Sequence, residues 1–361
     1  MRKRATIFDV AAKAGVSPAT VSLVLNGKPG VSPETRQRVL QAAEELNYRP
    51  NASARSLVLE KTNMLGVILP DIGSPFYSEV VQGVEQEATA QGYYLVLCTT
   101  CGKSSREEGY LHLFWEHRVD GLLLVTPRNE SLIQEIRKHG FPLVVLDRDI
   151  SLQDDVVEVI VDNFHGAIQA VEHLIHCGYR NIGFINGLPE IQASQERFRG
   201  YQTALRKHGL CFCPELVVEG DFTERGGYIA MKKLLSVASN LDAVFVANDW
   251  MALGALRAIR EQSLRVPDDI GLVGFDDVPL AAQTDPPLTT VRQPMREMGA
   301  LGVQLLIQLI KGKKVTPTKF TLPTELVLRG STRQIVGEKQ RDESRKAVPC
   351  AGRTKGKAWA L

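Results

Sequence analysis

The chain has 361 residues, with 43 Lys and Arg against 41 Asp and Glu and a formal net charge of +2 at pH 7. This length favours two or three folding units over a single core. The N-terminus lacks the apolar segment of a signal peptide, no apolar run reaches membrane-spanning length, and the six cysteines are scattered. These features argue against a secreted, membrane-bound or disulfide-stapled protein and favour a soluble cytoplasmic one.

Charge is distributed unevenly along the chain. Residues 1–61 hold 10 Lys/Arg against 5 Asp/Glu, and residues 333–361 hold 8 against 3. The stretch between them, residues 62–332, holds 25 basic and 33 acidic groups. A basic head on an acidic body favours a polyanionic partner at one end, although ordinary solvated surface with a basic tail is the alternative interpretation.

The first fifty residues predict three short helices separated by turns. The helices are expected over residues 7–14, about 18–25 and about 33–46. Each begins after a hydroxyl side chain in the capping position, namely Thr6, Ser17 and Ser32. Proline follows two of these caps, as is common in the first turn of a helix.

The second of these helices has two distinct faces. Helical spacing directs three apolar residues inward, which are Val21, Val24 and Leu25. The opposite face carries Pro18, Ala19, Ser22 and Leu23. A solvated face usually carries charge, whereas this one is small, hydroxylated and apolar, which points to a contact surface.

From residue 63 onward, buried strands alternate with amphipathic helices. The first strands are "MLGVILPD", "YYLVLCTT", "VDGLLLVTP" and "PLVVLDRD", and a second series runs through "RNIGFING", "LVVEGDF", "LDAVFVAND" and "DIGLVGFDD". The two series have the form of a repeated α/β unit. Two such lobes place a ligand cleft between the carboxyl ends of their parallel strands.

Four long motifs in collinear order resemble the lactose-repressor (LacI/GalR) family of bacterial transcription regulators. They are "TIFDVAAKAGVSPATVSLVLNG", "VSPETRQRVLQAAEELNYRPNASARSL", "FVANDWMALGALRAI" and "GLVGFDDVPLAAQTDPPLTTVRQP". The resemblance covers residues 5 to about 332. It implies an α/β core of two doubly wound parallel-sheet lobes, similar to type I periplasmic-binding proteins, with a small all-α helix-turn-helix domain before it.

The resemblance also implies a domain organisation and a function. The expected parts are a DNA-binding head over 1–50, a hinge helix or linker over 51–61, an effector-binding and dimerisation core over 62–332, and a disordered basic tail over 333–361. Residues 62–161 and about 292–320 would form one lobe, and residues 163–290 with the last strand the other. The implied protein is a cytoplasmic repressor, located on the nucleoid when it binds a palindromic double-stranded operator, with a sugar-like effector between its lobes. Because the tail has Leu361 as its only leucine and no leucine heptads, a homodimer is expected rather than a tetramer.

Several positions match the DNA contacts of the family. The implied base-facing residues are Pro18, Ala19 and Leu23, with Ser22 on the same face, and the implied backbone-facing residues are Thr6, Ser17, Thr20, Asn26 and Tyr48. Arginine is frequent in the family where Leu23 stands. Leucine cannot form the bidentate bond by which arginine selects guanine, but it can pack on a thymine methyl group. Packing of Leu23 under the hinge or against a partner chain is the alternative.

The hinge supplies a second implied DNA contact. Leu57 matches the family's intercalating leucine, and Ala54 matches the close-packed residue beside it. An apolar wedge in the minor groove costs a few kcal/mol of unstacking, which the kinked DNA offsets by a wider interface. Packing of Leu57 between linker and core is the alternative.

Residues at the ends of strands predict the effector site. Phe76 and Asp147 follow strands of the first lobe, and the family's ligand positions in the second lobe match Arg197, Phe222, Asn248, Asp276 and Gln293. Carboxylate, amide and guanidinium groups suit the hydroxyls of a carbohydrate, and phenyl rings can cover its apolar face. An acidic residue at a strand end also often caps the next helix. Both roles stay open for Asp71, Asp162 and Asn163.

No catalytic residue, metal ligand or cofactor is expected. The chain has no phosphate-binding P-loop, no His-Glu-x-x-His and no Gly-x-Ser-x-Gly motif. Cys98 and Cys101 lack a second ligand pair, and three histidines on one expected helix, His165, His173 and His176, are best explained as packed or solvated. A transport solute-binding protein and an α/β enzyme are the competing functions, and membrane association is not expected.

Overall fold

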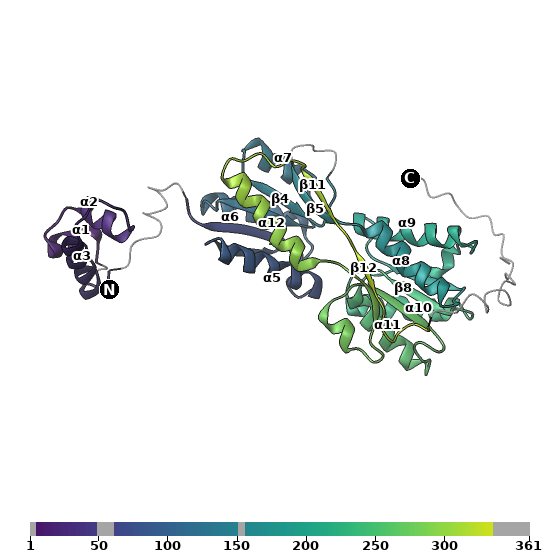
Figure 1. The fold of residues 1–361 in the computed structure, drawn as a ribbon. Coiled ribbons are helices and arrows are strands. Elements are labelled where there is room, and N and C mark those ends of the chain that lie inside the picture. Colours follow the sequence, from purple (N-terminus) through teal and green to yellow (C-terminus); the bar gives the residue numbers. More distant parts are fainter. Residues whose placement is uncertain (1–4, 49–60, 151–155, 335–361) are drawn as a thin grey trace. The chain divides into compact units, whose positions relative to one another are not determined.

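The computed structural model describes residues 5–48, 61–150 and 156–334. These residues form two compact units (Figure 1). The first contains residues 5–48, 61–63 and 118–120, and the second contains the remaining described residues. Ala54 and Leu57 of the expected hinge, and residues 335–361 of the expected tail, lie outside the described ranges.

The first unit contains three helices around a small core. They are α1 (Ile7–Ala14), α2 (Pro18–Leu25) and α3 (Pro33–Glu45). A capping box closes the start of α1, because the Thr6 N–H donates to Asp9 Oδ2 at 2.7 Å and the Asp9 N–H donates to Thr6 Oγ1 at 3.4 Å. The core consists of small apolar side chains on all three helices, including Val10, Val21 and Val39.

The first lobe of the second unit has a six-stranded parallel sheet in the order β11-β5-β4-β3-β1-β2. Its strands are β1 (Met64–Leu69), β2 (Tyr94–Thr99), β3 (Gly121–Val125), β4 (Leu143–Leu146), β5 (Val157–Val161) and β11 (Lys319–Leu322). The helices of this lobe are α5 (Pro75–Ala90), α6 (Ser104–Glu116), α7 (Glu130–Lys138) and α12 (Met295–Ile310). The near-continuous Val, Ile and Leu runs of β1, β3 and β4 match the burial that a parallel sheet covered on both faces imposes.

The second lobe repeats this arrangement with the order β12-β10-β9-β8-β6-β7. Its strands are β6 (Ile182–Asn186), β7 (Val217–Glu219), β8 (Ala243–Val246), β9 (Gly271–Asp276), β10 (Thr289–Arg292) and β12 (Glu325–Val327). Its helices are α8 (Asn163–His176), α9 (Gln192–Lys207), α10 (Glu224–Val237) and α11 (Asp249–Glu261), with 3-10 turns η1 (Pro214–Leu216) and η2 (Pro279–Gln283). All pairings are parallel except that of β12 with β10. The predicted fold class of two α/β parallel-sheet lobes with a helix-turn-helix head is therefore confirmed.

Three segments of the chain connect the two lobes. They join β5 to α8, β10 to α12, and β11 to β12, the last of which is the long yellow connection in Figure 1. Two of them are bonded to each other: the Asp162 N–H donates to the Leu322 carbonyl at 3.1 Å, and Thr324 Oγ1 donates to the Asp162 carbonyl at 3.3 Å. The last strand of the chain, β12, belongs to the second lobe, and β11 before it belongs to the first.

Helices α5 and α12 pack at very short range in the first lobe. A Cβ atom placed on Gly299 would lie 2.2 Å from the Val80 carbonyl oxygen, and one on Gly83 would lie 2.0 Å from that of Arg296. A side chain at either position therefore separates the two helices.

Arg333 continues the ordered chain beyond the last strand. Its N–H donates to Tyr179 Oη at 3.2 Å, and its guanidinium lies 4.7 Å from the centroid of that ring.

Within the described ranges, no single helix is long and apolar enough to cross a membrane; α1 and α2 meet those criteria only when joined across a 101° bend.

Candidate functional site

The hydroxyl side chains at the start of α2 complete its first turn. Ser17 Oγ accepts from the Thr20 N–H at 3.2 Å and lies 2.9 Å from Thr20 Oγ1. At the other end, Asn26 Nδ2 donates to the Ser22 carbonyl at 2.9 Å. Ser17 and Asn26 are exposed and Thr20 is half-buried, so these caps fix the helix and still present polar atoms to a partner.

The outward face of α2 carries no charged side chain. Leu23 is 36% exposed and Ala19 is also exposed, whereas Val21 and Val24 are buried in the core. Arg36 on α3 holds the end of the helix, because its guanidinium donates to the Val24 carbonyl at 3.2 Å and to that of Lys28 at 2.7 Å. Reading of bases by this face depends on apolar contact and on the Ser22 hydroxyl.

The other predicted DNA contacts are placed less uniformly. Thr6 is exposed and caps α1, and Pro18 is half-buried at the start of α2. Tyr48 is half-buried and packs against the core of the head, a contact that the sequence interpretation did not include.

All seven predicted effector residues line one pocket between the two lobes. They are Phe76, Asp147, Arg197, Phe222, Asn248, Asp276 and Gln293. Five further residues complete its wall, namely Ser74, Tyr77, Thr126, Ile191 and Ala193. The pocket encloses about 400 Å³ of space, counting the part open to solvent.

Asp276, Gln293 and Arg197 form the polar wall contributed by the second lobe. Gln293 Nε2 donates to Asp276 Oδ1 at 2.6 Å, and the two backbones are also bonded at 3.0 Å. One Arg197 nitrogen, Nη2, lies 4.0 Å from the same Oδ1 atom. All three residues are buried, with at most 3% of each exposed.

Arg197 is held by further contacts inside the second lobe. Its Nε donates to Asn163 Oδ1 at 2.9 Å, its Nη1 donates to the Ala247 carbonyl, and its guanidinium carbon lies 3.9 Å from the centroid of Phe275. The carboxylate within ion-pair distance of Arg197 is that of Asp276, which belongs to the same lobe. These contacts fix the guanidinium in one orientation at the pocket.

In the first lobe, a hydrogen-bonded chain leads from α5 to the pocket. Tyr77 Oη donates to Thr126 Oγ1 at 3.3 Å, and Thr126 Oγ1 donates to Asp147 Oδ2 at 3.1 Å. Thr126 and Asp147 follow the neighbouring strands β3 and β4 directly, so the parallel sheet brings them to the same edge.

Backbone conformation singles out the same pocket. Among the described non-glycine residues, ten have a positive φ, and four of these line the pocket: Thr126 (46°), Asp147 (56°), Phe222 (66°) and Asp276 (118°). Such conformations cost free energy and persist where the surrounding structure enforces them, which is common at functional sites.

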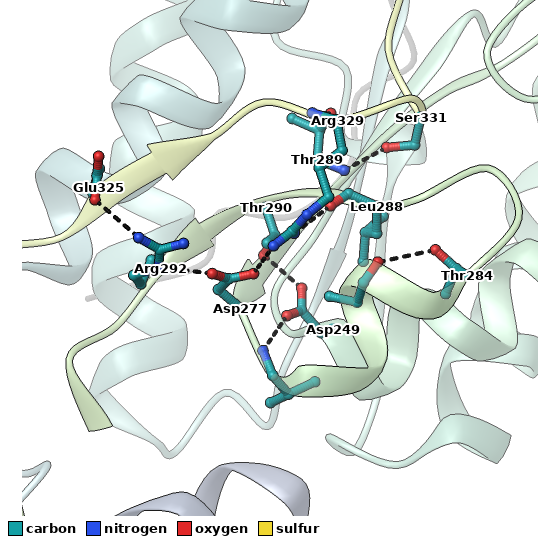
Figure 2. Close-up of polar contacts among 12 residues, drawn as sticks. Asp249, Asp277, Thr284, Leu288, Thr289, Thr290, Arg292, Glu325, Arg329 and Ser331 are labelled. Atoms are coloured by element: carbon teal, nitrogen blue, oxygen red, sulfur yellow. Dashed lines mark hydrogen bonds and ion pairs between the residues drawn. The ribbon is translucent and has the colours of Figure 1, made fainter. Parts of the chain in front are cut away.

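The chain neighbours of two pocket residues, Asp249 and Asp277, form the polar contacts that Figure 2 shows. Asp249, next to Asn248, accepts from Thr290 Oγ1 at 2.6 Å and from the Val278 N–H at 3.0 Å. Asp277, next to Asp276, accepts from Arg292 Nε at 2.7 Å and also from Arg329.

Asn248 itself begins α11. Its Oδ1 accepts from the Met251 N–H at 2.9 Å, and its Nδ2 donates to the Phe222 carbonyl at 3.4 Å. The capping role and the position in the pocket wall thus coexist in one side chain, and the bond to Phe222 ties the aromatic wall to α11.

Burial dominates the electrostatics of the pocket. It raises the pKa of Asp276 to about 7 and the pKa of Asp147 to about 6, although the positive charge of Arg197 acts in the opposite direction on both. It also raises the pKa of Tyr77 and lowers that of Arg197. A ligand that donates hydrogen bonds to the two carboxylates would stabilise their ionised forms.

The residues with two open interpretations lie outside the pocket wall. Asp71 is exposed, and its Oδ1 accepts from the Gly73 N–H at 2.9 Å. Asp162 caps α8 by accepting from the His165 N–H at 3.0 Å. Asn163 positions Arg197, as described above, and none of the three lines the pocket.

The histidines of α8 differ in surroundings. His165 has a carboxylate neighbour, because its Nδ1 lies 2.7 Å from Asp162 Oδ2. His173 is buried, its Nε2 lies 2.8 Å from Thr332 Oγ1, and burial lowers its pKa to about 4. No group of three or more His, Cys, Asp or Glu side chains within the described ranges has the geometry of a metal site.

Sequence reasoning missed five residues of the pocket wall. Thr126 could have been found by the rule that identified Asp147, because it directly follows the strand of "VDGLLLVTP". Ser74 and Tyr77 flank Phe76 in the chain, within one turn of α5. Ile191 and Ala193 carry no local signal, because only the arrangement of the two lobes brings the start of α9 to the pocket.

Comparisons with known proteins agree with this architecture. The family model "Bacterial regulatory proteins, lacI family" matches residues 6–51, and "Periplasmic binding protein-like domain" matches residues 171–332. Catabolite control protein A of Priestia megaterium is 38% identical over 330 residues, which cover 91% of this chain and 99% of the relative.

Solved structures of regulators match over a similar span. The lac repressor dimer bound to operator and the anti-inducer ONPF has a TM-score of 0.84 at 31% identity, covering 92% of this chain and 100% of that one. The transcriptional regulator CelR in complex with cellobiose has a TM-score of 0.69 at 37% identity, covering 91% and 100%. These proteins are regulators rather than enzymes. The chain belongs to the LacI family of bacterial regulatory proteins.

Proposed function

We propose that this regulator is a repressor that binds a palindromic operator as a homodimer, and that a small molecule in the interlobe pocket sets its affinity for DNA. The observation that carries the proposal is the convergence of all seven predicted effector residues in one pocket of a chain whose head is a helix-turn-helix domain. A ligand that prefers one arrangement of the lobes shifts the chain toward that arrangement, and this couples the pocket to the head.

The proposed DNA contacts divide into base readout and backbone contacts. Pro18, Ala19, Ser22 and Leu23 would face base edges in the major groove, while the caps at Thr6, Ser17, Thr20 and Asn26, together with Tyr48, would approach phosphates. Ala54 and Leu57 of the hinge would enter the minor groove. The regulator works in the cytoplasm, and its association with the nucleoid is part of this proposal, as are the domain limits at residues 50, 61 and 332.

The proposed effector is carbohydrate-like. Carboxylate, amide and guanidinium groups line the pocket together with phenyl rings, and the CelR structure named above is a complex with cellobiose. Asp276, Asn248 and Arg197 would bind hydroxyl groups, and Phe76 and Phe222 would cover an apolar ring face.

The proposal is tested by in vitro selection of operator sequences followed by gel shifts with the full chain. We expect the selected sites to be two-fold symmetric. We also expect that one compound in a screen of sugars, sugar phosphates and nucleobases changes the gel shift of the selected operator. Selected sequences without symmetry, or no enrichment at all, would contradict operator binding by a homodimer.

A further inference from the structure

The pocket wall offers more hydrogen-bond acceptors than the protein itself satisfies. Gln293 donates through Nε2 to Asp276, which fixes the orientation of its amide and directs Oε1 away from that carboxylate. This Oε1 atom is buried and has no hydrogen-bond partner among the described residues. A buried acceptor without a partner costs free energy, which a ligand donor at this position would recover.

The two carboxylates add further acceptors from opposite lobes. Asp147 accepts from Thr126 through Oδ2, and Asp276 accepts from Gln293 through Oδ1. Within the described part of the chain, these bonds occupy one oxygen of each carboxylate. The second oxygen of each is available to a ligand in the pocket.

Positive charge in the wall is limited to one side chain. Arg197 is the single Lys or Arg among the lining residues, and bonds to Asn163 and Ala247 already use two of its three nitrogens. Arg148, which follows Asp147 in the chain, instead donates to the Pro127 carbonyl. With both carboxylates ionised, the wall carries one net negative charge, which repels an anionic ligand in the pocket.

We propose that the pocket selects an uncharged ring compound with several hydroxyl groups and excludes its phosphorylated or carboxylated derivatives. The hydroxyls would donate to Asp147, Asp276 and Gln293, and the ring would lie against Phe76 and Phe222. This inference rests on the proposed function, since it assigns a ligand class to the same pocket.

The protonation behaviour of the wall supports this selection. Burial already raises the pKa of both carboxyl groups, and an anion beside them would raise it further. An anionic ligand would therefore enter together with a proton, whereas a neutral hydroxyl compound would favour release of one.

The test is a calorimetric titration of the full chain with matched neutral and anionic compounds at about pH 8, where both carboxyls are ionised. The pairs are glucose with glucose 6-phosphate, galactose with galacturonate, ribose with ribose 5-phosphate, and adenosine with adenosine 5′-monophosphate. We expect at least one neutral compound to bind, with its anionic partner about 100-fold weaker. An anion that binds as tightly as its neutral partner, or a set without any neutral binder, overturns the inference.

A pair of variants checks that the wall itself makes the selection. Asp147→Asn removes one charge and turns a free acceptor into a donor, so the ratio between neutral and anionic affinities should fall about tenfold. Asp71→Asn makes the same change at an exposed site of the same lobe outside the pocket, and it should leave the ratio unchanged. An unchanged ratio in Asp147→Asn overturns the inference.

Operator binding by the same preparations separates this inference from the proposed function. Fluorescence anisotropy with a selected operator measures DNA affinity without reference to the ligand class. If the chain binds its operator but does not prefer neutral over anionic compounds, the ligand class alone is refuted. If the chain does not bind an operator, the proposed function is refuted.

Discussion

Leu23 gives the recognition helix an apolar side chain at the centre of its exposed face. With no charge on this face, we expect Leu23 to lie against a thymine methyl group in each half-site. Leu23→Arg should therefore shift the preferred base toward guanine, with a discrimination of about 1–3 kcal/mol for a good bidentate pair.

In vitro selection with the original chain and with Leu23→Arg measures this shift. A salt titration on both winning sites accompanies it, because an arginine that grips a phosphate instead adds about 0.9 to the slope of log K against log salt. Identical selected half-sites would mean that Leu23 does not face the bases.

Asp276 makes the stability of the core depend on pH. Burial raises the pKa of Asp276 to about 7 in the folded chain, against an ordinary value of 3.8. At a pH between these two values, the folded chain still holds this proton, whereas the unfolded chain has lost it. Its contribution is fully present below the lower pKa and is lost as pH rises through the higher one. Asp276→Asn should thus weaken the decline in stability between about pH 5 and about pH 8, by at most about 1.4 kcal/mol per pH unit.

Urea unfolding of both chains at the two pH values measures this effect. The comparison must be between chains, because His173, whose pKa burial lowers to about 4, changes stability in the opposite direction over the acidic part of the range. Parallel pH profiles for the two chains would show that Asp276 is already ionised in the fold.

The pocket residues differ in how visible they are in the sequence. Asp147 and Asp276 stand directly after apolar strand runs, and this local pattern is sufficient to place them at the carboxyl edge of a sheet. The positive φ of Asp276 has no such signal, and the residue after it, Asp277, is held by arginines on β10 and on the segment after β12, which are distant in the sequence. Ile191 is invisible for a related reason, since it reaches the pocket through the packing of two lobes.

Helices α5 and α12 depend on glycine where they cross. Gly299→Ala places a methyl group 2.2 Å from the Val80 carbonyl oxygen, and backbone cannot yield as a flexible side chain can. The helices must separate, which should cost about 1–3 kcal/mol of unfolding free energy.

A second glycine offers a matched control for this substitution. Gly109 lies exposed on α6 with nothing within 4 Å of a Cβ atom, so Gly109→Ala should stabilise the chain by about 0.5–1 kcal/mol through helix propensity. Urea unfolding followed by near-ultraviolet circular dichroism measures both variants. Equal effects of the same sign would refute the role of the close helix contact.

Strands with strong apolar runs were predictable, and strands defined by their partners were not. β1 and β3 read as continuous apolar segments, which predict buried parallel strands. β11 and β12 are short, contain polar residues, and each pairs with one neighbouring strand. Apolar runs therefore predicted the strands inside the two lobes, whereas β11 and β12 depend on the strands beside them.

The head and the pocket belong to separate compact units of one regulator. Arg197→Ala removes the guanidinium from the pocket wall and touches no residue of the head. We expect this variant to bind its operator as the original chain does. Because the pocket loses an arginine that several bonds hold in place, its response to the effector should be at least about tenfold weaker.

Gel shifts with and without the effector measure both properties, and circular dichroism checks the fold of the variant. Ala247 and Asn163 lose a donor in this variant, so Arg197→Lys serves as a milder companion that keeps the charge. A full response in a folded Arg197→Ala chain would place the effector elsewhere.

The three connections between the lobes limit how the core can move. Three connections, two of them bonded to each other at Asp162, hold the lobes together at one end, and we expect them to restrict relative motion of the lobes more than a single connection would. The remaining motion that we expect is a hinge rotation that opens or closes the pocket. Ligands of different shape would then favour different degrees of closure.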